Sequence, residues 1–276
     1  DMLDEKLLCL HQVTVLKRWS MPEFVAGVAR AGIGAVAIWR DKLAEHGVAE
    51  TARLLQGAGL QVTSLCAAGL ITTPDRREAE VAMDTLRRAI DETAAIRAGT
   101  LMFVAGGIDV RDKDLAATRA RVLDRLATIT PYARAAGIRI ALEPLHPMTC
   151  GSRSVLNSLA IANDWCDALG AEDVYGIAID TYAVWWDPNL AREIARAGKR
   201  ICNFHVGDWL ADTRDLRLDR GMMGDGVIDI PAIRRLVEQA GYRGHIEVEI
   251  FSERDWWQRD PEEVIGVVKQ RYQTAV

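Results

Sequence analysis

The sequence lacks the features that would assign it to a membrane or nucleic-acid-binding class. No apolar run approaches the roughly 20 residues that a membrane-spanning helix needs. The net charge is −5, acids and bases are interspersed, and no basic stripe would fit a nucleic acid. The first residues, DMLDEK, are acidic and do not resemble a secretory signal peptide. We therefore expect a cytoplasmic protein whose partners include neither a membrane nor a nucleic acid.

Cysteine is too sparse and scattered to predict a disulfide framework. The five cysteines are an odd number, and they show neither a CxxC pair nor the spacing of a zinc finger. Their positions are Cys9, Cys66, Cys150, Cys166 and Cys202. This pattern favours reduced thiols in a cytosolic protein.

Strand-like and helix-like segments alternate along the whole chain without a linker or low-complexity segment. Eight strand candidates, each followed by a helical stretch, predict a (β/α)8 TIM barrel. At 276 residues and 49% hydrophobic, the chain suits a single domain over residues 1–276, with two smaller domains as the weaker option. The expected strands are 7–12, 35–39, 61–66, 100–105, 138–143, 176–181, 201–206 and 245–250. The expected helices are 21–31, 44–58, 75–98, 112–136, 154–169, 189–197 and 230–240.

Four of these strand candidates each end in a residue that could bind a metal. They are Glu143 in IALEPLHP, Asp180 in IAIDTY, His205 in NFHVGD and Glu249 in IEVEIF. The carboxyl ends of barrel strands meet at one rim, so the four side chains are expected to surround one divalent ion there. The oxygen-rich set favours Mn²⁺, with Mg²⁺, Co²⁺ and Zn²⁺ as alternatives. The competing interpretation is four strand-end residues that make only hydrogen bonds.

The alternation of side chains along the last strand supports the metal site. Ile246, Val248 and Ile250 share one face, and Glu247 and Glu249 share the other. Buried carboxylates are costly unless a cation or hydrogen bonds compensate them, so inward-facing acids favour a bound ion. Glu247 lies deeper in the barrel and is interpreted as an interior residue rather than a ligand.

Other residues could contact a substrate at the same rim. His146 follows EPL and could orient a substrate or move a proton, or it could only cap a backbone group. Arg220, in the glycine-rich DRGMMGDGVIDI, could bind an oxyanion, or it could be a surface arginine. His11 ends the first strand and could line the pocket. Trp39 and Trp185 could stack on a sugar, or they could pack in the helix ring or between subunits of a homo-oligomer. The long loop 207–229 is interpreted as a lid or substrate loop.

These segments resemble the xylose-isomerase-like TIM barrels, the sugar phosphate isomerase/epimerase superfamily, most strongly over residues 138–251. The resemblance implies one divalent metal on Glu143, Asp180, His205 and Glu249. It also implies that the two glutamates exchange the substrate proton and that Arg220 binds a substrate oxygen.

Two positions depart from the family pattern. Ala183 stands where many relatives have a substrate-contacting histidine three residues after the strand-six aspartate. Either another group such as His146 replaces it, or the alanine is an inactivating substitution. Thr149 stands where the ketose 3-epimerases have a glutamate, which weakens that specific assignment.

The sequence thus predicts a metal-dependent enzyme that isomerises or epimerises a keto-sugar through an enediolate. One alternative is a lyase or dehydratase that eliminates a β-substituent from a 3-keto-glycoside or related keto-polyol. A second alternative, suggested by Ala183, is a non-catalytic sugar-binding barrel. The sequence leaves open the substrate, the choice among these reactions, the metal and the oligomeric state.

Overall fold

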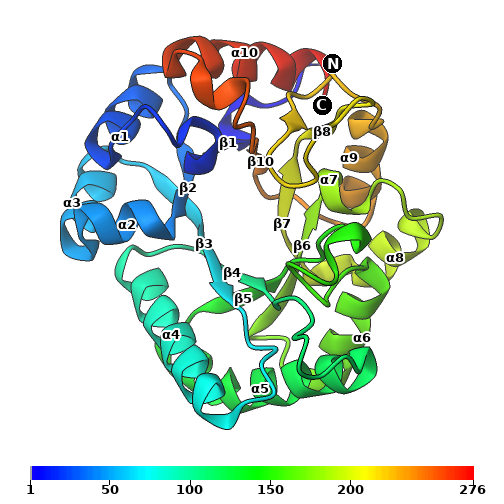
Figure 1. The fold of residues 1–276 in the computed structure, drawn as a ribbon. Coiled ribbons are helices and arrows are strands. Elements are labelled where there is room, and N and C mark those ends of the chain that lie inside the picture. The colour runs from blue at the N-terminus through cyan, green and yellow to red at the C-terminus, as the bar shows by residue number, and fades with distance from the viewer. Residues whose placement is uncertain (1) are drawn as a thin grey trace.

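The protein is a closed barrel of eight parallel strands surrounded by helices, as a computed structural model of residues 2–276 shows (Figure 1). The strands follow the chain order around the barrel, and the last closes the ring by pairing with the first through Leu8 and Ile246. The barrel strands are β1 (Leu8–His11), β2 (Ala35–Trp39), β3 (Gln61–Gly69), β4 (Thr100–Val104), β5 (Arg139–Leu142), β6 (Tyr175–Asp180), β7 (Ile201–Val206) and β10 (Ile246–Val248). The predicted (β/α)8 architecture is confirmed.

The helices cover the outside of the barrel and bury its apolar face. They are α1 (Met21–Arg30), α2 (Arg40–His46), α3 (Val48–Gly57), α4 (Arg76–Ala95), α5 (Leu115–Ala136), α6 (Leu159–Leu169), α8 (Leu190–Ala197), α9 (Ile230–Gln239) and α10 (Pro261–Thr274). The short α7 (Thr181–Val184) lies inside this ring, directly after β6 (Figure 1). The main core lies between this ring and the strands. Inside the barrel, the interior cluster is built mainly from small side chains such as Ala37, Ala141 and Ala178, which take up little of the lumen.

Two helical predictions need correction, and one helix had no predicted range. The expected helix 44–58 is two helices, because Gly47 between α2 and α3 has a φ of +101°, outside the helical region. The expected helix 154–169 begins only at Leu159, because Ser154 forms an isolated β-bridge with Gly106. Helix α10 was not predicted; its N-cap Asp260 accepts a hydrogen bond from the backbone N–H of Glu262.

The loop 207–229 contains a short antiparallel hairpin of β8 (Asp208–Trp209) and β9 (Arg220–Gly221). The buried carboxylate of Asp208 organises the loop by accepting backbone N–H groups of Gly224, Gly226 and Ile228 at 2.9–3.0 Å. These hydrogen bonds hold the backbone of the loop 207–229, and the loop in turn fixes the position of Arg220 at the rim of the barrel.

No helix within residues 2–276 combines the length and apolar content that crossing a bilayer requires. All five cysteines are free.

Candidate metal centre and active site

The four predicted ligands meet at the carboxyl-terminal rim of the barrel. Glu143 and Glu249 directly follow the ends of β5 and β10, Asp180 ends β6, and His205 lies near the end of β7. One donor atom from each residue lies within 4.8 Å of the donor atoms of the other three, and all four side chains are buried. The structure therefore brings together residues that are up to 106 positions apart in the chain.

The imidazole of His205 shows that this cluster fits a cation. Neither ring nitrogen has a hydrogen-bond partner among the described residues, although both are fully buried. Its Nδ1 lies 3.5 Å from Glu249 Oε1 and 3.7 Å from Glu143 Oε1, too far for good hydrogen bonds. Ligands that bind one ion through bonds of about 2.1 Å lie roughly 3.0–3.4 Å apart, close to these separations. An unpaired buried imidazole beside carboxylates is costly without an ion and favourable with one.

The electrostatics of the cluster also favour a positive charge. Burial raises the pKa of Glu143, and the neighbouring carboxylate of Glu249 adds to this shift. Burial would also raise the pKa of Glu249, but His205 and His11 outweigh it and hold that pKa well below its usual range. Three acidic side chains in one buried cluster need compensating cations, and a divalent metal would supply them.

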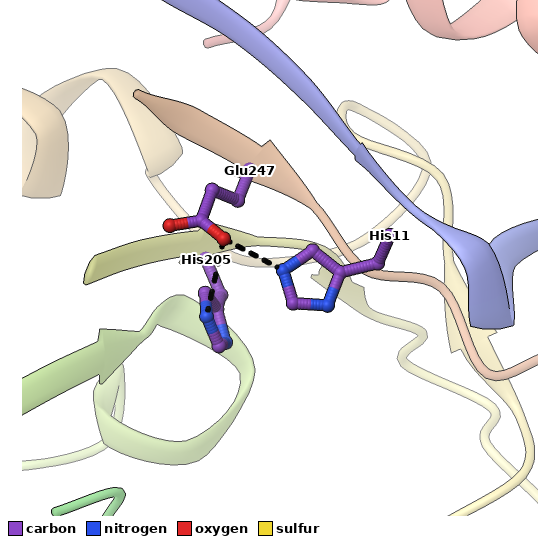
Figure 2. A group of neighbouring side chains, drawn as sticks. All are labelled: His11, His205 and Glu247. Carbon is purple, nitrogen blue, oxygen red and sulfur yellow. Dashed lines mark hydrogen bonds and ion pairs between the residues drawn. The ribbon is translucent and has the colours of Figure 1, made fainter. Parts of the chain in front are cut away.

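His11 links Glu249 to Glu247 in the barrel interior. Figure 2 shows its ring beside the Glu247 carboxylate. Its Nε2 is 2.9 Å from Glu247 Oε1, and its Nδ1 is 3.1 Å from Glu249 Oε2. Burial would lower the pKa of His11, but Glu249, Cys66 and Glu247 together outweigh it and raise that pKa well above the ordinary value. His11 is not among the side chains that line the cavity, so its two nitrogens contact carboxylates rather than the open pocket.

Glu247 lies inside the barrel, as predicted, and hydrogen bonds hold its carboxylate there. Thr63 Oγ1 donates to its Oε1 at 2.8 Å, and Asn203 Nδ2 donates to its Oε2 at 2.9 Å. Figure 2 shows its carboxylate next to both His11 and His205. The Glu247–His11–Glu249 chain was not predicted. The pleat placed both glutamates on one face, but their histidine partner comes from the opposite end of the chain.

Arg220 is part of the cluster and not a surface arginine. Its Nη1 donates to Asp180 Oδ2 at 2.9 Å and lies 3.4 Å from Glu249 Oε1. The guanidinium also lies over the rings of Tyr182 and Phe251, 4.3 and 4.9 Å from their centroids. Arg220 thus supplies one positive charge beside two of the candidate ligands.

A cavity opens above the cluster at the rim. Among the four candidate ligands, Glu143 and Glu249 line it, whereas Asp180 and His205 do not. The other lining residues are Trp39, Cys66, Ala67, Val104, Leu145, His146, Thr149, Arg153, Tyr182, Ala183, Leu216, Arg217, Arg220 and Phe251. The two glutamates are therefore the ligand candidates that a molecule in this cavity would meet first.

His146 lines the cavity and also caps a backbone group. Its Nδ1 accepts the backbone N–H of Met148 at 3.1 Å, and its ring packs against Trp209 at a centroid distance of 4.7 Å. Partial burial lowers the pKa of His146. Because Nδ1 is engaged by the backbone, Nε2 is the nitrogen left to contact a ligand.

The remaining predicted residues lie at different depths. Ala183, on α7, lines the cavity, and its carbonyl accepts the indole N–H of Trp186 at 2.6 Å. Trp39 lines the cavity and meets Phe251 edge to face. Trp185 is not among the lining residues; it packs against Trp209 at a centroid distance of 5.8 Å. Trp185 therefore packs against Trp209 and does not face the cavity.

A sequence profile described as xylose isomerase-like TIM barrel matches residues 25–269. The chain belongs to this family. The match includes all four residues of the candidate metal centre and Arg220.

Individual relatives extend this comparison. The chain is 44% identical to a Sinorhizobium meliloti 1021 protein of known crystal structure, with a TM-score of 0.95 and 99% of each chain covered. It is 27% identical over 237 residues to L-ribulose 3-epimerase of Methylomonas sp. (strain DH-1), covering 83% of this chain and 77% of the relative. The crystal structure of the IolI protein with a bound zinc atom has a TM-score of 0.83 at 19% identity, with 95% of each chain covered.

Proposed function

We propose that the protein is a divalent-metal-dependent isomerase or epimerase that acts on a keto-sugar through an enediolate. One observation carries this proposal: two buried glutamates of the four-residue cluster, Glu143 and Glu249, face a single cavity at the barrel rim. The likeness to L-ribulose 3-epimerase supports a small sugar as the substrate. The zinc atom of the IolI protein supports a metal in this fold, and the oxygen-rich donor set here favours Mn²⁺.

The residues divide the work in this proposal. A divalent ion held by Glu143, Asp180, His205 and Glu249 would act as a Lewis acid that stabilises negative charge on the substrate oxygens. One cavity-facing glutamate removes the proton from the carbon next to the carbonyl, and the electron pair of that C–H bond moves into the enediolate. The other glutamate delivers a proton to the opposite face. The proton count is unchanged, and the product is the epimer.

Arg220 and His11 fix the position of Glu249, one of the two acid–base residues in this scheme. Arg220 lies 3.4 Å from Glu249 Oε1 and leaves its Nε without a hydrogen-bond partner among the described residues. His11 contacts the other oxygen of Glu249 at 3.1 Å. Each oxygen of the Glu249 carboxylate thus has one contact, to Arg220 or to His11. These contacts restrict rotation of the carboxylate and keep it oriented toward the cavity.

A lyase that eliminates a β-substituent from a 3-keto-glycoside or keto-polyol is the second candidate. The apolar part of the cavity favours it, because Trp39, Leu145 and Phe251 could contact a bulky apolar leaving group. Both reactions begin with removal of the α-proton, and they differ in what the enediolate does next. A non-catalytic sugar-binding barrel would remove no proton.

Exchange of solvent deuterium tests the proposal. The Mn²⁺-loaded protein is incubated in D₂O with D-ribulose, D-fructose and a 3-keto-glucoside, and each sugar is analysed by NMR and mass spectrometry. We expect deuterium at the carbon next to the carbonyl of at least one ketose, together with its epimer or isomer. Release of the aglycone from the 3-keto-glucoside, without a deuterated epimer or isomer of any sugar, would identify a lyase. Unchanged sugars throughout would contradict both enzymatic proposals.

The substitution Ala183→His tests the missing histidine. Ala183 lines the cavity from α7, next to Tyr182, and shares that cavity with Glu143 and Glu249. A histidine there could bond a substrate hydroxyl or move a proton, an effect worth about 10²–10⁴-fold when well placed. We expect kcat/KM for a ketose to rise at least about tenfold, with metal content matched between the two proteins. An unchanged rate at normal metal content would show that the alanine suits the native substrate.

A further inference from the structure

We propose that Arg153 and Arg217 form a subsite for an anionic substituent, a carboxylate or a phosphate, at the end of the sugar remote from its reacting carbons. The inference rests on the proposed function, because it concerns the substrate of the same cavity. Both arginines line that cavity with the two glutamates. Neither guanidinium has a hydrogen bond or ion pair with any residue from 2 to 276.

Arg153 is presented by a tightly held loop after β5. The carbonyl of Thr149 accepts the backbone N–H groups of Ser152, Arg153 and Ser154 at 2.7–3.2 Å. Ser154 then pairs with Gly106 in a β-bridge. The backbone is therefore fixed while the half-buried guanidinium stays free. Both guanidinium groups line the same cavity. Burial lowers the pKa of Arg153, and the like charge of Arg217 adds to this shift.

Arg217 is presented in a similar way by the loop between β8 and β9. The side chain of Asp215 accepts the backbone N–H groups of Arg217 and Leu218 at 2.8 and 2.9 Å. The carbonyl of the neighbouring Leu216 accepts the hydroxyl of Tyr182 at 2.8 Å. Asp215 thus holds the turn through backbone groups and forms no ion pair with the Arg217 guanidinium. The side chain of Arg217 is exposed at the opening of the cavity.

Other arginines at this end of the barrel have partners. Arg111 pairs with Asp109 and Glu78, Arg121 pairs with Asp112, and Arg220 pairs with Asp180. Exposed arginines such as Arg254 also lack ion pairs, but they do not line the cavity. Two unpaired guanidinium groups that line the same cavity could both donate charge-assisted hydrogen bonds to one anion bound there. The carboxylate of Glu143 partly offsets the lowered pKa of Arg153, yet no contact within 4.0 Å joins the two side chains.

The subsite predicts a charge preference in binding. A carboxylate or phosphate on the sugar would accept charge-assisted hydrogen bonds from one or both guanidinium groups, an effect of about tenfold or more in affinity. We would measure dissociation constants by calorimetry on the Mn²⁺-loaded protein, at fixed ionic strength, for D-fructose, D-fructuronate and D-fructose 6-phosphate. Inorganic phosphate serves as a probe for an adventitious anion site.

The expected result is that one or both anionic sugars bind at least about tenfold more tightly than D-fructose. The sugar with the larger preference identifies carboxylate or phosphate as the natural group. Arg153→Gln and Arg217→Gln should each reduce this preference several-fold. The preference is measured as the dissociation constant of D-fructose divided by that of the anionic sugar. Arg214→Gln is the matched control, because Arg214 is exposed in the same loop but does not line the cavity.

Equal affinities for all three sugars would overturn the subsite, as would a preference that survives both substitutions. Binding of inorganic phosphate alone, without a preference among the sugars, would show an adventitious anion only. Deuterium exchange separates this outcome from failure of the proposed function. Deuterium exchange without a charge preference would overturn the subsite but support the proposed enzyme. A charge preference that depends on the arginines, without deuterium exchange into any sugar, would support the subsite but contradict the proposed reaction.

Discussion

Replacing Glu249 by glutamine is expected to lower kcat/KM at least about 10³-fold while the barrel stays folded. The substitution keeps the size of the side chain but removes its negative charge and its capacity to accept a proton. A positioned acid or base contributes about 10²–10⁴-fold by itself, and the loss of a charged metal ligand adds to that effect. His11, Arg220 and His205 all contact the Glu249 carboxylate, so the substitution also disturbs these three contacts.

The measurement is a steady-state assay at saturating Mn²⁺, with metal content determined for each protein and the fold checked by circular dichroism. Glu253→Gln is the matched control, because Glu253 lies four residues further on and is exposed. The control should keep parental activity. If Glu249→Gln binds metal and retains activity within tenfold of the parent, Glu249 is not an acid–base residue.

The strands and the grouping of the four candidate ligands were predictable because each depends on local pattern and one topological rule. Apolar runs located eight strands, and the shared rim of a parallel barrel then grouped Glu143, Asp180, His205 and Glu249. Most predicted strand ends lie within two residues of the observed ones. Strand β3 is the exception and runs on to Gly69. No detail of packing was needed for this part of the site.

The contacts that depend on closure of the barrel were not predictable. His11 bonds Glu247 and Glu249 because β1 pairs with β10, and the registers of these strands decide which side chains meet. Arg220 faces Asp180 because the Asp208 carboxylate folds its loop, a set of backbone hydrogen bonds that leaves no periodic signal in the sequence. A glycine-rich loop alone fits a surface arginine as well as a buried one.

The substitution His205→Gln is expected to abolish tight metal binding and nearly all activity. His205 is the only nitrogen donor of the four-residue cluster, and both of its ring nitrogens lack hydrogen-bond partners among the described residues. The parent protein should bind one equivalent of Mn²⁺. Metal at 100 times its dissociation constant stabilises a folded protein by about 2.7 kcal/mol, which corresponds to a rise in Tm of about 5–10 °C for a chain of this size.

Metal content by mass spectrometry and thermal unfolding with and without EDTA provide readouts that are independent of activity. EDTA should lower the Tm of the parent but leave the Tm of His205→Gln unchanged, because the variant has no tightly bound ion to lose. His245→Ala is the control: His245 precedes β10 at the opposite end of the barrel and should retain both the metal and the EDTA response. A parent protein that binds no Mn²⁺ at the concentrations of the assay, or a His205→Gln variant that binds it normally, would rule out this cluster as the metal centre. Among residues 2–276, the three buried carboxylates would then be compensated by Arg220 and by the protons of His11 and His205.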